Sequence, residues 1–342
     1  MLGASVARES AESFRKALAA RRIVDKTHAI IEDGNMILLP LTAPAPADVL
    51  LQYHANAVEA RFPERGHMTP PIDDVRRIAD IPERLRSLLP GGWERFGDVA
   101  VLKLPKELDG FEKEVGEAYA SVLGLKAVLR ETSGISGEFR RPSTRKIFGG
   151  DTLVTHVENH IVFRFDASEI MFSSGNQEER LRMAGLRCDG ETVVDMFAGI
   201  GYFSLPLAVY QKPKRIVSCE INPTAHSFLS QNIRLNHVED KVEPVLGDNR
   251  ELPGKEIADR VIMGYVKTTH LFLPTAIRLL KSGGVLHYHE TCPEELIPDR
   301  PLKRIAEAAV GYNVQVLRLK QIKSYAPGVD HVVVDARILK SS

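Results

Sequence analysis

The sequence predicts an α/β fold in which a doubly wound, mostly parallel sheet is preceded by a smaller α+β domain. From about residue 171 onward, short β-branched runs alternate with helical patterns, as crossover connections between parallel strands require. Three successive runs also end at, or just before, acidic or amide side chains, namely Asp195, Glu220 and the pair Asp248 and Asn249. Because the carboxyl ends of parallel strands meet at one edge of a sheet, these groups are expected to share one site.

The chain is expected to divide into three parts, 1–72, 73–170 and 171–342. A Pro-rich tract and the sequence Thr-Pro-Pro at 69–71 mark the first boundary. The first part combines a helical pattern with a β-like pair around the turn at 33–35, and it is a candidate RNA-contacting domain. The middle part is a mixed α+β segment, and the last part is expected to form the doubly wound sheet.

Individual elements follow from periodicity and from residues that begin or end helices. In the first part, the patterns predict a helix at 12–22 and β-like segments at 27–31 and 36–40. In the middle part they predict a helix at 111–123, ended by Gly124, and strands at 97–104, 127–129, 152–158 and 160–165. In the last part, Asn222 caps a helix that starts at Pro223. A further helix from near Thr269 ends at Gly283-Gly284, before a strand at 285–289.

The segment from Val193 to Phe203 is typical of a nucleotide-cofactor loop. Gly199 and Gly201 follow the strand that ends at Asp195, and glycine lets the backbone approach a ligand closely. Glu220 stands twenty-five residues after Asp195, where an acid suits a ribose diol. The acids could instead cap helices and the glycines merely make a turn, but their joint order and spacing favour a cofactor site. The third glycine of the dinucleotide motif is absent, which favours S-adenosylmethionine over NAD and a Rossmann-like class I S-adenosylmethionine-dependent fold.

Two further segments are candidates for the reacting end of the cofactor. Ser173 offers a hydroxyl and Arg180 a planar fork suited to a carboxylate, although residue chemistry alone favours a capped surface helix with an exposed arginine. The segment Asp259 to Val266 lacks the Asn/Asp-Pro-Pro-aromatic pattern that orients amino nucleophiles in many methyltransferases, so ordinary N-methylation is disfavoured. Gly264 either leaves open space beside the cofactor or is needed only for the turn.

Composition excludes several classes of function. Lys plus Arg and Asp plus Glu are equal at 45 each, so overall charge does not announce a nucleic-acid partner. Cys188, Cys219 and Cys292 are far apart and no window resembles a membrane span, which predicts a cytoplasmic protein with reduced thiols and no membrane partner. His287 and His289 share one face of a strand but lack an obvious third ligand, so they are expected to be packed and no metal is predicted.

Local basic clusters offer two candidate RNA contacts. Four basic residues flank a Gly-rich loop that contains Phe139, and they are Arg140, Arg141, Arg145 and Lys146. Lys323 precedes Tyr325 near the C-terminus. Both clusters pair phosphate-binding cations with an aromatic ring that suits stacking on a base. Clusters of this kind are also common on solvated surfaces, so the residues alone leave RNA binding open.

Taken together, the motifs resemble the archaeal wybutosine-synthesis enzymes, whose sister family is the tRNA guanine-37 N1-methyltransferases. The resemblance covers about residues 76–342 and rests on Val193 to Phe203, Phe172 to Asn176, Asp248-Asn249, Asp259 to Val266, His287 to Thr291, Lys323 to Gly328 and the Gly-Glu-Phe-Arg segment at 137–140. Met263 to Val266 and His287 to Thr291 favour the wybutosine branch, and the methylase branch typically has an arginine in the place of Gly175. Residues 1–72 faintly resemble the small N-terminal domain of the longer methylases.

The resemblance implies a transferase that moves the 3-amino-3-carboxypropyl group of S-adenosylmethionine to a tricyclic guanosine derivative in the anticodon loop of tRNA(Phe), at position 37. It implies cofactor contacts from Ser173 and Arg180 at the amino-acid end, from Glu220 at the ribose, and from Asp248 and Asn249 at the adenine. The Gly199 and Gly201 loop would pack under the adenosyl group. No general base and no obligate protein partner is indicated. The alternatives are an N1-methyltransferase and a catalytically silent RNA-binding module.

Overall fold

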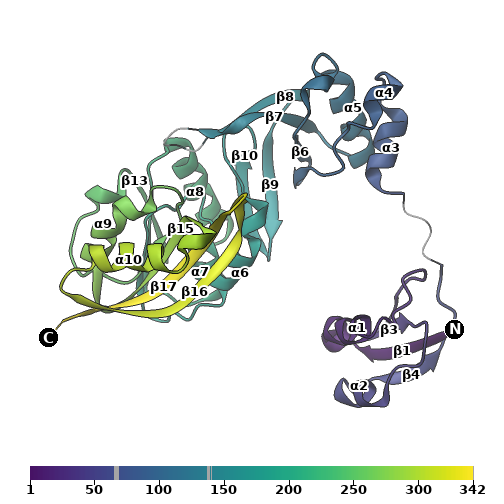
Figure 1. Ribbon diagram of the computed structural model, residues 1–342, viewed down its shortest axis with the longest axis horizontal. Coiled ribbons are helices and arrows are strands. Elements are labelled where there is room, and N and C mark those ends of the chain that lie inside the picture. The colour runs from purple at the N-terminus through teal and green to yellow at the C-terminus, as the bar shows by residue number, and fades with distance from the viewer. Residues whose placement is uncertain (65–68, 137–138, 140, 342) are drawn as a thin grey trace. The chain divides into compact units, whose positions relative to one another are not determined.

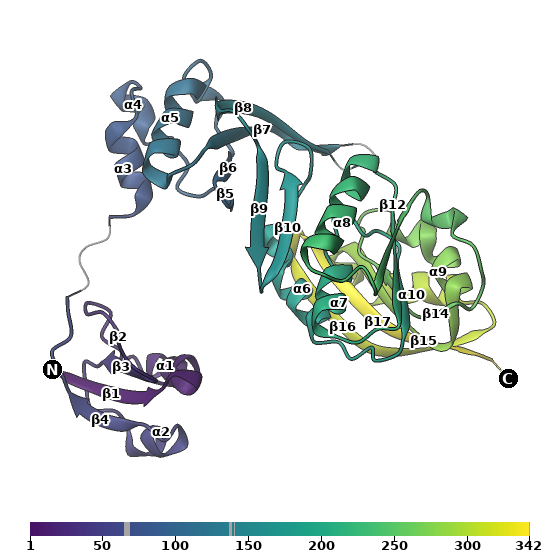
Figure 2. The same ribbon diagram turned by 180° about the vertical axis from the view of Figure 1, so that it is seen from behind.

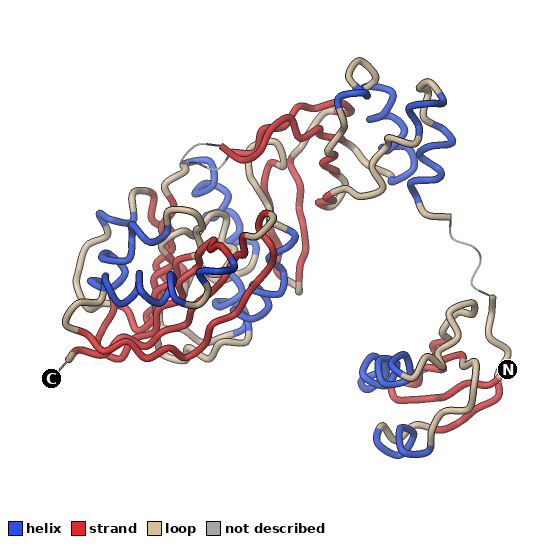
Figure 3. The backbone as a smooth tube through the Cα atoms, viewed as in Figure 1, coloured by secondary structure: helices blue, strands red, loops and turns tan. Residues whose placement is uncertain are grey.

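The computed structural model describes residues 1–64, 69–136, 139 and 141–341, and the chain forms two compact units, Met1–Asp73 and Asp74–Ser342. Figure 1 labels the elements, Figure 2 shows the reverse view, and Figure 3 separates helices from strands by colour. The boundary lies in the first turn of α3 (Pro71–Ile78). Division of the second unit into two domains at residue 170 stays a prediction.

The first unit is a four-stranded antiparallel sheet with two helices. The sheet order is β2-β3-β1-β4, formed by β1 (Leu2–Ala7), β2 (Ile31–Asp33), β3 (Met36–Pro40) and β4 (Asn56–Glu59). Its helices are α1 (Ala11–Ala20) and α2 (Ala47–Gln52). Phe14 and Leu18 on α1 are fully buried in the core of this unit. The expected hairpin forms around Gly34, but its first strand starts at Ile31, later than the 27–31 pattern indicated.

The second unit begins with helices and a small sheet in the order β5-β6-β7-β8. The strands are β5 (Glu94–Phe96), β6 (Val99–Leu102), β7 (Ala127–Ser136) and β8 (Arg141–Gly149), and the helices beside α3 are α4 (Glu83–Arg86) and α5 (Glu112–Leu123). β6 and β7 are parallel because α5 is the crossover between them. Gly124 ends α5 in the left-handed conformation at φ 64°, as its position in the sequence predicts.

A separate antiparallel hairpin, β9 (Leu153–Glu158) and β10 (Ile161–Asp166), packs against α8 (Pro223–Leu235). Side-chain amides from this helix and its C-cap bind the outer edge of β10. Asn236 accepts from the N–H of Val162 at 2.9 Å and donates to its carbonyl at 2.8 Å, and Asn232 accepts from the N–H of Arg164 at 2.7 Å. The hairpin is therefore hydrogen-bonded to α8 and its C-cap residue.

The main sheet has seven strands in the order β13-β12-β11-β14-β15-β17-β16. The strands are β11 (Thr192–Asp195), β12 (Arg215–Glu220), β13 (Val242–Leu246), β14 (Ala258–Met263), β15 (Leu280–Pro293), β16 (Tyr312–Ala326) and β17 (Val329–Lys340). The first five strands are parallel, and the β16–β17 hairpin joins β15 antiparallel. The predicted doubly wound fold is confirmed. The sequence analysis did not anticipate the β16–β17 hairpin.

Helices cover both faces of this sheet (Figure 2). Val193 packs into a core with α7 (Ser204–Tyr210), α8 and the buried Met183 of α6 (Gln177–Ala184). Its neighbour Val194 points to the opposite face, into a core with α9 (Leu273–Leu279) and α10 (Asp299–Ala308). Successive buried side chains on one strand require apolar layers on both sides. The helix expected to run to Gly283-Gly284 ends at Leu279 instead, because Leu280 already pairs with Ala258.

Candidate functional site

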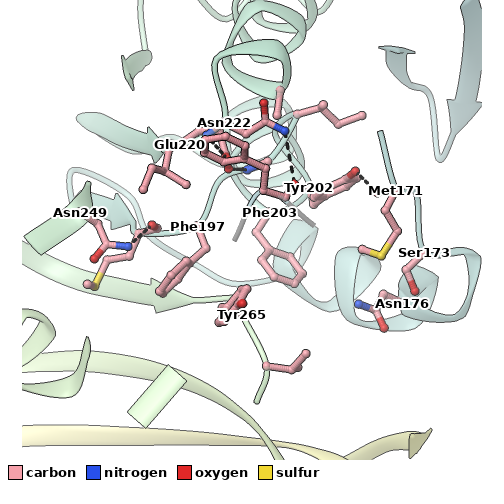
Figure 4. Close-up of a pocket in the computed structure, with 18 of the residues that line it drawn as sticks. Met171, Ser173, Asn176, Phe197, Tyr202, Phe203, Glu220, Asn222, Asn249 and Tyr265 are labelled. Carbon is pink, nitrogen blue, oxygen red and sulfur yellow. Dashed lines mark hydrogen bonds between the residues drawn. The ribbon is translucent and has the colours of Figure 1, made fainter. Parts of the chain in front are cut away.

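A cavity of about 550 Å³ opens at the carboxyl ends of the parallel strands. Figure 4 shows its lining side chains, which come from the loops after β11, β12, β13 and β14 and from the segment before α6. The cavity brings together most of the predicted cofactor residues, which are Ser173, Arg180, Gly199, Glu220, Asp248, Asn249 and Gly264. Their contacts with a cofactor stay predictions, whereas their shared location is a property of the fold.

Glu220 connects two loops at the centre of this edge. One carboxylate oxygen accepts from the N–H of Gly199 at 2.7 Å, and the other accepts from the N–H of Asn222 at 2.8 Å. Burial raises the pKa of Glu220 against the opposing effect of these backbone hydrogen bonds. Gly199 adopts φ 58°, a conformation that glycine tolerates best. Each carboxylate oxygen retains a second lone pair, so Glu220 is able to accept from a ribose diol while it holds the loops.

Asp195 and Gly201 lie behind this loop, outside the cavity lining. The carboxylate of Asp195 is fully buried and accepts from the hydroxyl of Ser204 at 2.7 Å, and burial raises its pKa to about 6. At Gly201, with φ 103°, a Cβ would lie 2.6 Å from Cγ of Leu205. The cofactor contacts expected of Asp195 and Gly201 stay predictions, although neither residue lines the cavity. Both residues fix the loop against the start of α7.

The adenine end of the predicted site combines one amide with aromatic rings. Asn249 is buried, and its amide nitrogen donates to the carbonyl of Met196 at 2.7 Å. The Asn249 amide oxygen has no hydrogen-bond partner in the described part of the chain. Phe197 stacks on Tyr265, with centroids 5.1 Å apart, and both rings line the cavity (Figure 4). Sequence analysis did not single out these rings, although each stands two residues after the end of a strand, Phe197 after β11 and Tyr265 after β14.

Asp248, beside Asn249, is engaged by its own turn. Its carboxylate accepts from the backbone N–H of Arg250 at 2.9 Å and pairs with the Arg250 guanidinium, which holds the pKa of Asp248 below its usual value. An ionised acceptor therefore stands at the mouth of the cavity. Arg250 donates to both carboxylate oxygens, and the contact of Asp248 with the adenine side of the cofactor stays a prediction.

Arg180 was expected either to present an open fork to a carboxylate ligand or to lie exposed on a surface helix, and it does neither. It is 3% exposed rather than at the surface, and its fork makes two 2.7 Å hydrogen bonds to the carboxylate of Glu158. Its remaining nitrogen donates to the carbonyl of Ser173 at 2.9 Å, and the guanidinium lies over the Phe172 ring, 4.7 Å from its centroid. The fork is thus committed to Glu158, which corrects the idea that it is open to a carboxylate ligand.

Lys323 takes a place in the cavity that sequence analysis assigned to RNA. Its Nζ donates to the hydroxyl of Ser173 at 2.9 Å, and Lys323 lines the cavity. Gly175 makes room for it, because a Cβ at this position would lie 3.1 Å from the Lys323 Nζ. A lysine from β16 therefore brings a positive charge to the Ser173 end. The signal in the sequence was present, since Lys323 belongs to the same motif as Tyr325, but its strand was not predicted.

Gly264 does not leave open space beside the cofactor. A Cβ there would lie 2.4 Å from the ring of Phe203, so the ring already fills that volume. Phe203 and the neighbouring Tyr202 both line the cavity (Figure 4). The role of Gly264 is therefore to admit an aromatic wall.

The two histidines of β15 are buried, as predicted. His287 hydrogen-bonds through Nδ1 to Asp335 at 2.5 Å and through Nε2 to Arg260 at 2.6 Å. His289 hydrogen-bonds through Nδ1 to Nε2 of His331 at 3.0 Å, and His331 lines the cavity. Across the described residues, no group of three or more His, Cys, Asp or Glu side chains is placed to hold a metal ion.

Only part of the basic cluster around the β7–β8 turn is available to bind RNA phosphates. The guanidinium of Arg145 pairs with Glu112, which Arg130 also contacts at 2.8 Å, and Lys146 donates to the carbonyl of Gly150 at 2.8 Å. Arg141 is exposed, and Arg140 lies outside the described residues. Phe139 from the same turn lines the cavity. Phe139 thus forms part of the cavity wall, whereas Glu112 largely neutralises the charge of Arg145. In the described ranges, no helix has the length and apolarity needed to span a membrane.

Substitution of Glu220 by alanine is expected to weaken S-adenosylmethionine binding about ten- to a hundredfold. The loss of charged hydrogen bonds costs roughly 1.5–3 kcal/mol, and the loop at Gly199 also loses its anchor. Calorimetric titration of the parent and the variant measures the change. Glu243→Ala, in an exposed pair with Arg215, is the matched control and should bind as the parent does. Equal affinities for the Glu220 variant and the parent would contradict the assignment.

Comparisons with known proteins place this geometry in a family. Residues 154–317 match the TRM5/TYW2 methyltransferase domain, and residues 76–152 match the TYW2 N-terminal domain. The chain is 48% identical over 265 residues, 77% of its length and 94% of the relative's, to a Pyrococcus horikoshii protein named tRNA(Phe) (4-demethylwyosine(37)-C(7)) aminocarboxypropyltransferase. It is 35% identical, over 98% of its length and 99% of the relative's, to tRNA (guanine(37)-N(1))-methyltransferase Trm5b of Pyrococcus abyssi.

A solved structure gives the same relationship. The chain superimposes on P. horikoshii TYW2 in complex with MeSAdo with a TM-score of 0.72 and 44% sequence identity. The match covers 79% of this chain and all of that one. Both the sequence and the fold of this chain are therefore similar to those of these proteins.

Proposed function

Because this chain belongs to the wybutosine-synthesis branch of the TRM5/TYW2 family, we propose that it transfers the 3-amino-3-carboxypropyl group of S-adenosylmethionine to C7 of a tricyclic guanosine derivative at position 37 of tRNA(Phe). The observation that carries this proposal is the 48% identity to an aminocarboxypropyltransferase over 94% of that relative's length. S-adenosylmethionine is the group donor, and methylthioadenosine is the product that leaves, in accord with the MeSAdo complex of the related structure.

The choice between two reactions depends on which carbon of the sulfonium faces the nucleophile. Sulfur carries a methyl carbon and the γ-carbon of the methionine chain, and the carbon that lies in line between sulfur and the nucleophile is transferred. Ser173 and Lys323 form a polar, cationic corner that suits the amino-acid end of the donor. Arg180 supports this corner through the carbonyl of Ser173. A methionine chain held at this corner has its γ-carbon turned toward the nucleophile.

A double-label experiment tests the proposed reaction. S-adenosylmethionine labelled separately at the methyl and at the carboxyl carbon is incubated with tRNA that carries the tricyclic precursor. We expect only the carboxyl label to enter the RNA, with release of methylthioadenosine. Transfer of the methyl label, with release of S-adenosylhomocysteine, would establish an N1-methyltransferase instead. tRNA that carries unmodified guanosine at position 37 is the control and should accept neither label.

The substrate is a tRNA, and we infer that its anticodon loop approaches at the β7–β8 turn. Phe139 at the cavity mouth suits stacking on an unpaired base, and Arg141 and Lys146 on β8 suit phosphates. Residues 1–72 stay a candidate for further RNA contacts, and we expect no obligate protein partner. A reaction on tRNA together with three buried, unpaired cysteines favours a cytoplasmic location.

Replacing both Arg141 and Lys146 with alanine is expected to weaken tRNA binding and to flatten its dependence on salt. Each lost phosphate contact lowers the slope of log K against log salt by about one unit. Filter binding at several salt concentrations measures that slope. The Arg145→Ala variant is the matched comparison and should change the slope less, because Glu112 already neutralises Arg145. Identical slopes for the double variant and the parent would show that the cluster is a solvated face.

A further inference from the structure

Asn222 lies between the predicted ribose acid and the aromatic residue offered to the RNA. It is the N-cap of α8, is 3% exposed and lines the cavity beside Glu220 (Figure 4). Its backbone N–H donates at 2.8 Å to Glu220, whose other carboxylate oxygen accepts from the N–H of Gly199. Its side-chain Nδ2 donates to the carbonyl of Phe139 at 3.3 Å, across 83 positions of the chain. One buried residue thus joins the donor loops to the connection between β7 and β8.

The two halves of the Asn222 amide have separate roles. Oδ1 accepts from the N–H of Thr224 at 3.0 Å and so caps α8. A backbone N–H can only donate and a carbonyl can only accept, so the two partners fix the amide with Nδ2 toward Phe139. Asp, Ser and Thr would serve equally as helix caps. Capping alone therefore does not account for the hydrogen bond from Nδ2.

Phe139 is the kind of residue that such a hydrogen bond would support. It lines the cavity and is 42% exposed, so much of its surface has no protein contact. The position of the ring then depends mainly on the position of its backbone. The Phe139 carbonyl is bonded to a side chain that is itself held by the first turn of α8 and by Glu220. The backbone of Phe139 is thereby fixed relative to the predicted ribose acid.

We propose that Asn222 is a positioning residue whose amide holds Phe139 at the cavity, where the ring stacks on an unpaired base of the tRNA beside the donor. The inference rests on the proposed function, which assigns Phe139 to the RNA. The contact between Asn222 and Glu220 uses the backbone N–H, which every replacement except proline retains. A change of the amide is therefore expected to affect the tRNA rather than the donor.

Asn222→Ser tests this role, because serine still caps α8 but lacks the amide donor. In steady-state reactions with tRNA that carries the tricyclic precursor, we expect KM for the tRNA to rise about 3–10-fold, the effect of one net hydrogen bond. Stacking that is equal in the ground state and the transition state changes KM alone, so kcat should stay within about twofold of the parent. Calorimetry should give an S-adenosylmethionine affinity within about twofold of the parent, and thermal melting checks that α8 is intact.

Asn222→Asp is the second variant, and it decides the question if the serine variant does not fold. Aspartate is as good a cap as asparagine, but it turns an acceptor toward the carbonyl of Phe139. KM for the tRNA should therefore rise at least as much as in Asn222→Ser. Ser227→Ala, at an exposed position of α8 outside the cavity lining, is the matched control and should leave KM and kcat unchanged.

A double-variant cycle separates positioning of Phe139 from a general effect on α8. Phe139→Ala removes the ring and should raise KM for the tRNA by itself. If the amide acts only through this ring, adding Asn222→Ser to Phe139→Ala should raise KM no further. An equal effect of Asn222→Ser with and without the ring would show that Asn222 acts through the helix or through Glu220, and would overturn the inference.

The remaining outcomes distinguish this inference from the proposed reaction. Parent values of KM for the tRNA in both Asn222 variants, with the carboxyl label still entering the RNA, would overturn the inference and leave the reaction in place. Entry of the methyl label, with KM raised in both variants, would overturn the proposed reaction and support the role of Asn222.

Discussion

Glu158→Ala is expected to lower the free energy of unfolding by about 3–5 kcal/mol, because it leaves the buried guanidinium of Arg180 without its counter-ion. The two groups form a bidentate pair with both hydrogen bonds at 2.7 Å, and both side chains are nearly inaccessible to water. A charge in this position has no solvent to replace the lost partner. Urea denaturation of the parent and the variant measures the difference.

Two controls show whether the effect comes from the unpaired charge. Glu243→Ala removes one partner of an exposed pair with Arg215 and should cost less than about 1 kcal/mol. Glu158→Leu combined with Arg180→Met removes both charges and should recover much of the stability that Glu158→Ala loses. If Glu158→Ala unfolds as the parent does, Arg180 reaches water in solution and the buried pair is not a structural anchor.

Acid is expected to destabilise the fold well above the range in which most carboxylates titrate, because His289 is buried as a neutral ring. Burial and the charge of Arg182 lower the pKa of His289 to about 3, against the opposing charge of Asp335. The unfolded chain takes up this proton below its ordinary pKa of 6.5, whereas the folded chain does so only near 3. The stability contributed is present above pH 6.5 and is lost as pH falls toward 3. The full difference corresponds to about 4–5 kcal/mol.

The informative window lies between pH 6.5 and 5, where few carboxylates titrate. Burial also lowers the pKa of His287, so other buried histidines add to the slope in the parent. The comparison is therefore between the parent and His289→Asn, with unfolding free energies measured at intervals of half a pH unit. The parent should lose up to about 1.4 kcal/mol more per pH unit than the variant. Parallel curves would show that the pKa of His289 is the same in the folded and the unfolded chain.

The part of the site that follows from local rules was predictable from the sequence. Strand ends with acids and glycine turns are short-range patterns, and they correctly placed Gly199, Glu220 and Asn249 at one edge of the sheet. The confirmed fold class rests on the same alternation of strands and helices. Even here, pattern alone did not separate Asp195, which faces the interior, from Glu220, which faces the cavity.

The remaining features depend on contacts between residues far apart in the chain. Lys323 reaches Ser173 across 150 positions, and Arg182 reaches Asp335 across 153. No periodicity encodes which buried arginine meets which carboxylate, so Arg180 was expected at the surface. His331, which lines the cavity, was overlooked for the same reason, because its strand β17 belongs to the unpredicted β16–β17 hairpin. Such partners are fixed by the order of strands in the sheet rather than by local sequence.

The amides that bind β10 also affect how the protein behaves at high concentration. A two-stranded hairpin exposes unpaired N–H and carbonyl groups along its edges, and such edges recruit strands from other molecules. Asn232 and Asn236 occupy the groups at Val162 and Arg164 that an incoming strand would need. The side chains of α8 and its C-cap residue thus block this edge of the short hairpin and oppose edge-to-edge aggregation.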